Sequence, residues 1–296
     1  MQCAPASAVL ATKLSKASRA QRWEVDEELD WPSSIDDDAW CTSPELVSIA
    51  GTDLWASLDE PTRVRVARFE AGNFFSLTLQ GERPLVAGMS DLLYSTRISP
   101  EATEYIHHFI DEENKHMAMF GRFCRTYIGK VYPEKKVNLP RRFASGERIV
   151  SMFCKIMVVE EVGDYHNVLM QADTRLPRIV REIHRVHHRD ESRHIGFGSS
   201  LMRELWATYA SGWSVAERAD FQAWLANYMK SSWGDFYNPS VYRDAGLDRG
   251  PHGVDPYALR REAIESPQAV ELHVRASRRL IGFFLREGLL EEAPSM

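Results

Sequence analysis

Apolar residues in the middle of the chain recur at alternating steps of three and four positions, the spacing that places them on one face of an α-helix. Four segments show this pattern, and they span about residues 61–89, 100–130, 146–171 and 175–207. No segment alternates apolar and polar residues with a period of two between turn residues, as strands do. The sequence therefore predicts an all-α protein built on a bundle of four long helices.

Helix start signals support these boundaries. Ser99-Pro100-Glu101 combines an N-cap residue, a proline in the first turn and an early acid. Related signals occur at Ser43-Pro44-Glu45, at Asp59-Glu60-Pro61, at Ser214 with Glu217, and at Ser266-Pro267. They predict further helices at about 215–232 and 266–288, with residues 231–240 as a loop. The C-terminal residues 211–296 are expected either to form a cap or dimer surface on the bundle or to complete its core.

Each of the four apolar stripes is interrupted near its centre by carboxylates or imidazoles. The interrupting residues are Glu82, Glu113, His116, Glu160, His187, Glu191 and His194. A carboxylate buried among apolar side chains costs several kcal/mol unless it is paired, protonated or bound to a metal ion. Four interrupted stripes in one bundle therefore indicate a buried cation.

The spacing of these residues indicates how metal ions are held. Glu113-x-x-His116 and Glu191-x-x-His194 are two Glu-x-x-His pairs, and residues three apart project from one helix face. With one Glu from each of two other helices, this is the ligand pattern of ferritin-like di-iron carboxylate bundles. His187 lies four residues before Glu191, and we interpret it as a further ligand rather than a core histidine. Oxygen and imidazole ligands suit iron or manganese.

Several neighbouring residues leave alternatives open. Glu160 is preferred to Glu161 because it lies on the more apolar row, and Glu70 is a conceivable substitute for Glu82. Asp190 is expected to support a ligating imidazole. Asp111 and Glu112 are weaker candidates for such support or are solvated charges, and His184 and His188 are interpreted as core histidines. Six phenylalanines either line a substrate pocket or belong to the core: Phe74, Phe75, Phe109, Phe120, Phe153 and Phe197.

Three segments together resemble the para-aminobenzoate N-oxygenase family of AurF-like di-iron enzymes: IDEENKH (110–116), VVEEVGDYHN (158–167) and HHRDESRHIGFG (187–198). The last is the most specific, because that family reads H-x-R-D-E-S/T-x-H at this helix. The resemblance extends over about residues 60–210 and fades toward both ends of the chain. Carried over residue by residue, it implies the same ligands: Glu82, Glu113, His116, Glu160, His187, Glu191 and His194.

The resemblance implies a ferritin-like bundle, a homodimer, whose two iron ions activate O2. The implied reaction oxidises a primary, usually aromatic, amine through hydroxylamine and nitroso stages toward a nitro group, in secondary metabolism. The catalytic chemistry would rest on the metal ligands alone. Two alternatives stay open: a di-iron hydroxylase, desaturase or other oxidase on the same scaffold, and an iron-storage protein. The extra imidazole of His187 speaks against storage.

Composition excludes other classes of function. The net charge is −6, and residues 24–38 alone hold eight acids, so no basic surface is expected to recruit nucleic acid or a membrane. The acidic stretch itself either docks a basic partner or is a solvated segment. No apolar run is long enough to span a bilayer. Four widely spaced cysteines without a CxxC pair favour free thiols and a cytoplasmic location.

The chain also lacks a motif for flavin, nicotinamide or an iron–sulfur cluster, so the electrons are expected from an external donor. Residues 1–22 contain no acid and are rich in Ser, Ala and basic residues, which predicts a flexible N-terminal arm, with a transit peptide as the alternative. Residues 23–296 are predicted to form a single ferritin-like di-iron domain, with the metal-binding bundle at about 60–210.

Overall fold

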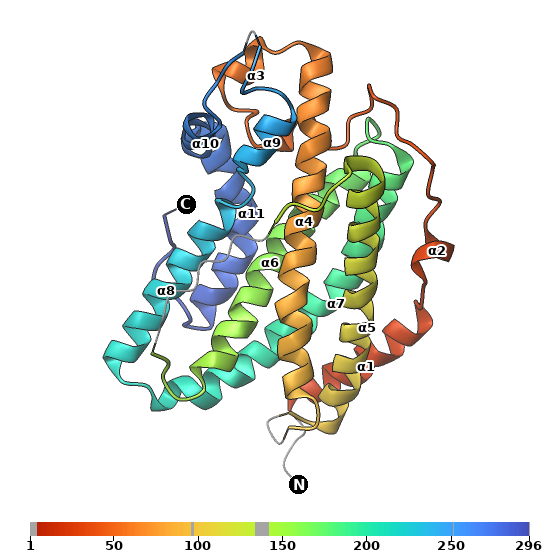
Figure 1. Cartoon of the computed structure of the whole chain (residues 1–296). Coiled ribbons are helices and arrows are strands. Elements are labelled where there is room, and N and C mark those ends of the chain that lie inside the picture. The colour runs from red at the N-terminus through yellow and green to blue at the C-terminus, as the bar shows by residue number, and fades with distance from the viewer. Residues whose placement is uncertain (1–4, 96–97, 134–141, 251, 296) are drawn as a thin grey trace.

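The computed structural model describes residues 5–95, 98–133, 142–250 and 252–295, and these residues form helices, turns and loops without a strand (Figure 1). The predicted all-α class is therefore confirmed. Within the described ranges, no helix has both the length and the apolar character needed to cross a membrane. Cys41, Cys124 and Cys154 are buried free thiols, whereas Cys3 lies outside the described residues.

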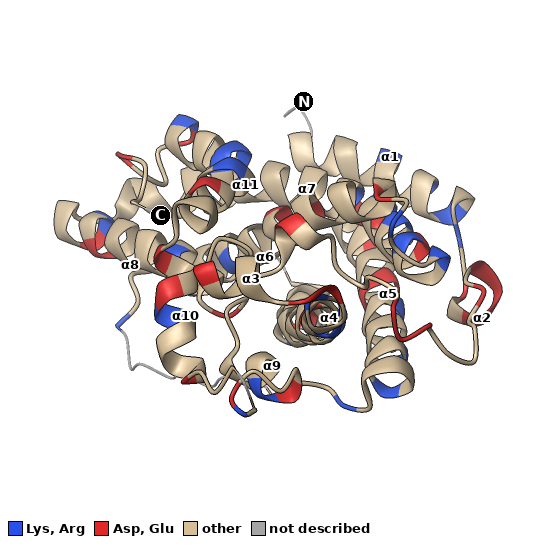
Figure 2. Cartoon of the chain, turned by 90° about the horizontal axis from the view of Figure 1, so that it is seen from above, with Lys and Arg blue, Asp and Glu red and all other residues tan. Residues whose placement is uncertain are grey.

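Four long helices build the centre of the molecule, as predicted. They are α4 (Glu60–Leu92), α5 (Pro100–Phe123), α6 (Glu147–Ala172) and α7 (Arg178–Tyr209). Helix α4 packs on α5 and α6 packs on α7, while contacts of α4 with α6 and of α5 with α7 close the bundle. Seen end-on in Figure 2, α4 lies in the middle of the molecule, between α5, α6 and α9 (Pro239–Asp244). This arrangement is the predicted ferritin-like fold.

Most of the predicted caps form, and one does not. The side chains of Asp59, Ser99, Ser214 and Ser266 each accept a hydrogen bond from a backbone N–H of the first helical turn. Ser43 was expected to start a helix, but only a single 3-10 turn follows at Pro44–Leu46. The Ser43 hydroxyl donates instead to the Asp173 carboxylate at 2.6 Å, so a tertiary contact has replaced the local cap.

The C-terminal third contains two predicted and two unpredicted helices. Helices α8 (Val215–Trp233) and α11 (Pro267–Arg286) match the prediction, whereas α9 (Pro239–Asp244) and α10 (Pro256–Glu265) were not foreseen. Both begin with proline after a capping side chain, Asn238 or Asp255, which is the signal that the sequence offered. Elsewhere, Ala210–Gly212 forms a 3-10 turn and Cys124–Ile128 a π-helical turn.

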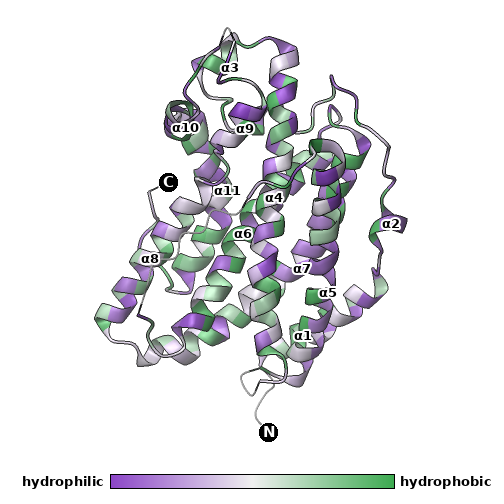
Figure 3. Cartoon of the chain, viewed as in Figure 1, coloured by the Kyte–Doolittle hydropathy of each residue, from purple (hydrophilic) through white to green (hydrophobic). Residues whose placement is uncertain are grey.

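Helix α6 lies at the centre of the hydrophobic core. It contacts α4 and α7 on one side and α8 and α11 on the other, and Figure 3 shows apolar residues around much of its circumference. Phe221 of α8 and Leu280 of α11 belong to the same buried cluster as Phe153 of α6. The C-terminal helices therefore complete the bundle core, the second of the two alternatives.

The predicted flexible N-terminal arm is wrong for residues 6–20, which form helix α1 (Ala6–Ala20) packed against α5 and α7. The backbone N–H and hydroxyl of Ser7 both donate to the Glu204 carboxylate, at 2.9 and 2.5 Å. The buried face of α1 consists of small residues: Ser7, Ala8, Ala11, Ser15 and Ser18. Small side chains let helices approach closely, but a serine and alanine stripe does not look hydrophobic in the sequence. Residues 1–4 lie outside the described part of the chain.

The acidic stretch that follows runs along the bundle through α2 (Val25–Glu28) and is tied to it by ion pairs. Figure 2 shows that basic and acidic residues are interspersed along the helices. The pairs join Glu24 to Lys115, Asp26 to Arg122, Glu28 to Arg185 and Arg189, and Asp37 to Arg68. Half of the eight acids thus face basic residues of this chain itself. The short helix α3 (Asp53–Ser57) then leads into α4.

The substitution Ala11→Asp tests the docking of α1. Ala11 is fully buried, and an unpaired carboxylate at this position costs several kcal/mol, so α1 should detach while the bundle stays folded. Trypsin should then cleave within α1 at Lys13 or Lys16 much faster than in the wild type, with unchanged helical circular dichroism of the remainder. Thr12→Asp, on the exposed face, is the control. Equal cleavage rates for both variants would contradict the docking of α1.

Candidate metal centre

The seven residues that interrupt the apolar stripes come together inside the bundle. They form two groups in which ligand atoms from all members lie within 4.8 Å of one another. The first group is Glu82, His116, His187 and Glu191, and the second is Glu113, Glu160, Glu191 and His194. Each group of buried carboxylates and imidazoles could hold one metal ion. Glu191 belongs to both groups and thus lies between the two positions.

All four bundle helices contribute to these groups because each stripe faces the bundle axis. Helix α5 supplies one Glu-x-x-His pair and α7 the other, together with His187, while α4 and α6 supply Glu82 and Glu160. The Glu191 carboxylate of α7 contacts imidazoles from both helices. Its Oε1 lies 2.8 Å from Nε2 of His187 on α7 and 3.3 Å from Nδ1 of His116 on α5. Across the second group, His194 Nδ1 lies 2.7 Å from Glu113 Oε1.

The inward-facing atoms of this cluster make no hydrogen bond with the protein. They include both carboxylate oxygens of Glu82, Glu113 and Glu191, Oε1 of Glu160, and one ring nitrogen of each histidine. Buried polar atoms are nearly always hydrogen-bonded, because an unpaired one costs about 1–3 kcal/mol. So many unpaired atoms facing one another fit a pair of cations, which would use these lone pairs as ligands.

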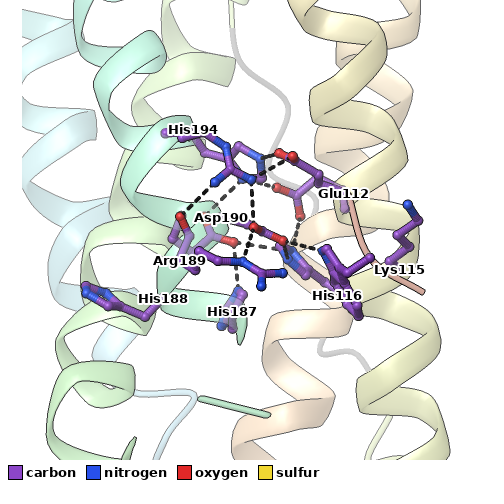
Figure 4. A network of polar contacts seen from close by, with 12 residues as sticks. Glu112, Lys115, His116, His187, His188, Arg189, Asp190 and His194 are labelled. Atoms are coloured by element: carbon purple, nitrogen blue, oxygen red, sulfur yellow. Dashed lines mark hydrogen bonds and ion pairs between the residues drawn. The ribbon is translucent and has the colours of Figure 1, made fainter. Parts of the chain in front are cut away.

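The outward-facing ring nitrogens, by contrast, are all bonded to other side chains. His116 Nε2 lies 3.2 Å from Asp190 Oδ2, and His194 Nε2 lies 2.8 Å from Glu112 Oε2. Figure 4 shows Asp190 of α7 facing His116 of α5. His187 Nδ1 lies 2.8 Å from the Asn167 side chain. The Asp190 and Glu112 carboxylates can accept the outer N–H of His116 and His194, which fixes these two rings and leaves their inner nitrogens free for a metal.

The expected support by Asp190 is thus present, and Glu112 provides a second example. Glu112 is buried, whereas its neighbour Asp111 is exposed and pairs with Lys115 at 2.8 Å. Arg193 links the two supporting carboxylates, because its Nη2 donates to Asp190 at 2.6 Å and to Glu112 at 2.7 Å.

Three further residues of this outer layer were not foreseen: Trp23, Asn167 and Arg193. The Trp23 indole N–H donates to Asp190 Oδ2 at 2.8 Å, although the two residues are 167 positions apart. Arg193 lies three residues after Asp190 in the HHRDESRH segment, a spacing that could have suggested the pair. No sequence signal links Trp23 to the site, since only the packing of the N-terminal segment brings it there.

Burial and mutual charge shift the titration of the inner groups. Burial, together with the charge of Glu113, raises the pKa of Glu82 and of Glu191. For Glu113 burial acts in the same direction, but the imidazoles of His194 and His116 outweigh it and lower its pKa. Burial also opposes protonation of His116 and His194, yet the surrounding carboxylates raise both pKa values. Without metal, protons therefore compensate the buried carboxylates.

The structure separates the alternative residues from the site. Glu161 faces away, with its Oε1 3.4 Å from Arg279 Nε, which supports the preference for Glu160. Glu70 accepts a hydrogen bond from Ser48 and belongs to neither group, which supports Glu82. His184 is buried and bonded to Asn167 at 2.7 Å, as expected for a core histidine. His188 has a partner, Asp164 at 2.5 Å, but its side chain is 34% exposed, so it is not a core residue.

A cleft of about 510 Å³ runs between α4, α6, α8 and the loop at 235–238. Thr78, one turn before Glu82, and Gly163, one turn after Glu160, both line it. Of the six phenylalanines considered above, Phe74 lines the cleft. Phe109 instead stacks on His194, with ring centroids 3.8 Å apart, and Phe120 packs edge-on against His187. The cleft thus lies along the two helices that carry Glu82 and Glu160.

The raised pKa of Glu70, a buried carboxyl group outside the site, can be tested through the pH dependence of stability. Burial raises its pKa to about 8, from an ordinary value of 4.5. Between these values the folded protein keeps a proton that the unfolded chain has lost, so this group's contribution to stability falls as the pH rises toward 8. Glu70→Gln should therefore melt at nearly the wild-type temperature at pH 5 and a few degrees higher at pH 8.5. The exposed Glu60→Gln is the control, and a pH-independent difference for Glu70→Gln would contradict the assignment.

Comparison with known proteins agrees with this geometry. The family model described as P-aminobenzoate N-oxygenase AurF matches residues 4–288, well beyond the range of about 60–210 expected from the segments noted above. No curated protein matches the sequence of the chain. The wider match includes α1 and the C-terminal helices, both of which pack on the bundle. Since the model covers nearly the whole chain, the protein belongs to the AurF family of p-aminobenzoate N-oxygenases.

Proposed function

We propose that this protein is a di-iron, O2-dependent N-oxygenase that oxidises a primary, aromatic amine to hydroxylamine, nitroso and nitro products. The observation that carries the proposal is the set of unpaired carboxylate and imidazole atoms at the centre of the bundle. Membership of the AurF family supports the same reaction type. The ligands would be Glu82, Glu113, His116, Glu160, His187, Glu191 and His194.

The donor set supports iron as the metal. Four carboxylates and three imidazoles are ligands of iron and manganese, whereas no thiol reaches either group among the described residues. Glu191 would contribute to both positions, since its Oε1 lies near His187 of the first group and its Oε2 near His194 of the second. Bound iron would activate O2 and supply the oxidant for the amine nitrogen.

The protein's own residues would position the reactants and exclude water. The outer partners Asp190, Glu112 and Asn167 would hold the three imidazoles in place during changes of metal charge. The cleft would admit the amine along α4 and α6, where Phe74, Val158 and Val162 give an apolar lining for a ring. Formation of a hydroxylamine from an amine and O2 also consumes two electrons and two protons and releases water. An external donor would supply these electrons.

The first test is metal content followed by reaction with O2. The purified chain reconstituted with Fe(II) should bind about two irons, and its reduced form should produce a visible absorption band on mixing with O2 and then convert an arylamine. Two irons without amine oxidation would favour a hydroxylase, desaturase or storage role. A chain without iron would contradict the di-iron proposal.

His187→Ala tests the third imidazole as a ligand. The variant should remain folded, because the apolar partners of α7 are unchanged, but iron affinity should fall about tenfold or more. Iron titration with a chromophoric competitor measures this loss. His188→Ala, the adjacent position outside both groups, is the matched control. Wild-type affinity and turnover in His187→Ala would remove His187 from the ligand set.

Gly163→Leu tests the cleft as the substrate site. Gly163 is buried within α6, where glycine costs about 1 kcal/mol relative to alanine, yet an added Cβ would meet no atom within 4 Å. A leucine there should fill part of the cleft and raise the KM for the amine about tenfold, with iron content unchanged. Gly196→Leu, also with open space around its Cβ but outside the cleft lining, should leave KM unchanged. Equal KM values in both variants would indicate that the substrate binds outside this cleft.

A further inference from the structure

Trp23 lies against the outer side of the proposed iron site. Its side chain is 5% exposed, and its indole N–H donates to Asp190 Oδ2 at 2.8 Å. The same Oδ2 lies 3.2 Å from Nε2 of His116, whose other ring nitrogen faces the site. Three side chains thus form one hydrogen-bonded line from the N-terminal segment to a proposed ligand.

The Trp23 and His116 rings also face each other. The Trp23 indole is stacked on the His116 imidazole, with centroids 6.1 Å apart and planes inclined by 26°. The next residue, Glu24, has a side chain that is 55% exposed, so the segment reaches the protein surface directly beyond Trp23. The path from solvent to the proposed site here crosses one indole and one carboxylate.

The proposed reaction needs such a path. Formation of the hydroxylamine from the amine and O2 consumes two electrons, and these come from outside the chain, because the sequence contains no motif for a flavin, nicotinamide or iron–sulfur cofactor. The ligand groups are themselves almost completely buried. Electron tunnelling weakens steeply with distance, and it is faster through aromatic rings and hydrogen bonds than across gaps between side chains.

We propose that Trp23, Asp190 and His116 form the electron entry route to the di-iron centre, an inference that rests on the proposed function. An external one-electron reductant is oxidised by one electron, and one iron is reduced from Fe(III) to Fe(II). No covalent bond forms or breaks, and the indole proton stays in its hydrogen bond to Asp190. A second transfer reduces the other iron.

Trp31 provides a matched comparison within the same segment. Its indole N–H donates to the backbone carbonyl of Val25 at 3.1 Å, and its ring stacks on Tyr127, away from Asp190. Loss of this indole removes a hydrogen bond and a ring contact of the same segment without interrupting the line to His116. A Trp31→Phe variant therefore separates the route from general packing of the segment.

The experiment measures reduction of the oxidised, iron-loaded protein. Wild type, Trp23→Phe and Trp31→Phe are oxidised with O2 and then mixed without oxygen with reduced methyl viologen, and loss of the ferric absorption is followed by stopped flow. The reduction rate should fall tenfold or more in Trp23→Phe and stay within twofold of wild type in Trp31→Phe. Iron content and melting temperature are measured for each protein before mixing.

The Trp23→His variant distinguishes the electron route from a purely positioning role of Trp23. An imidazole can still donate a hydrogen bond to Asp190, but its smaller ring leaves a gap in the aromatic path to the surface that the indole fills. Slow reduction in both Trp23→His and Trp23→Phe, with two irons bound, supports the electron route. Recovery of the wild-type rate in Trp23→His, or loss of iron together with the rate in Trp23→Phe, overturns it in favour of positioning.

The remaining outcomes separate this inference from the proposed function. A wild-type rate in Trp23→Phe overturns the route alone, provided that the wild-type protein binds two irons and oxidises an amine. A wild-type chain that binds no iron overturns the proposed function and the route together.

Discussion

The compensation of four carboxylates inside one helical bundle is the constraint on which the rest of this structure depends. Glu82, Glu113, Glu160 and Glu191 are at most 4% exposed, and their inner oxygens find few protein donors. Such groups would destabilise an ordinary core, since an unpaired buried carboxylate costs several kcal/mol. Three imidazoles and either protons or metal ions restore the balance. Apolar clusters flank this polar layer, one with Phe109 and Phe153 and the other with Phe120 and Ile183.

A second polar layer surrounds the first and explains why distant segments pack here. Asp190 and Glu112 hold the outer nitrogens of two imidazoles, and both carboxylates are joined by Arg193. Arg193 also donates to Gln21 at 2.6 Å, while Trp23 donates to Asp190. The N-terminal segment is therefore part of the site's support. The packing of α1 and the hydrogen bonds of Gln21 and Trp23 reinforce each other in a stretch that looks flexible in sequence.

The helices and the inner layer could be predicted because their signals are local. Steps of three and four residues place side chains on one helix face whatever the partner helix is, so α4 to α7 and the Glu-x-x-His pairs were readable. The choice of Glu160 over Glu161 followed from the same periodicity, since a shift of one residue turns a side chain by about 100°. Residues such as Asn167 and Trp23 carry no local signal, because their role depends on which distant side chain they meet.

The sequence by itself determined the all-α class, the four long helices and the seven residues at their polar centres, because helix periodicity and burial are properties of single segments. Only the tertiary structure decided that α1 packs on α5 and α7, that Glu191 lies between both groups, and that Trp23 reaches Asp190. It also decided where the cleft opens, between α4, α6 and α8. These features arise from contacts between segments far apart in the chain, and their energies depend on the relative placement of helices, which periodicity does not encode.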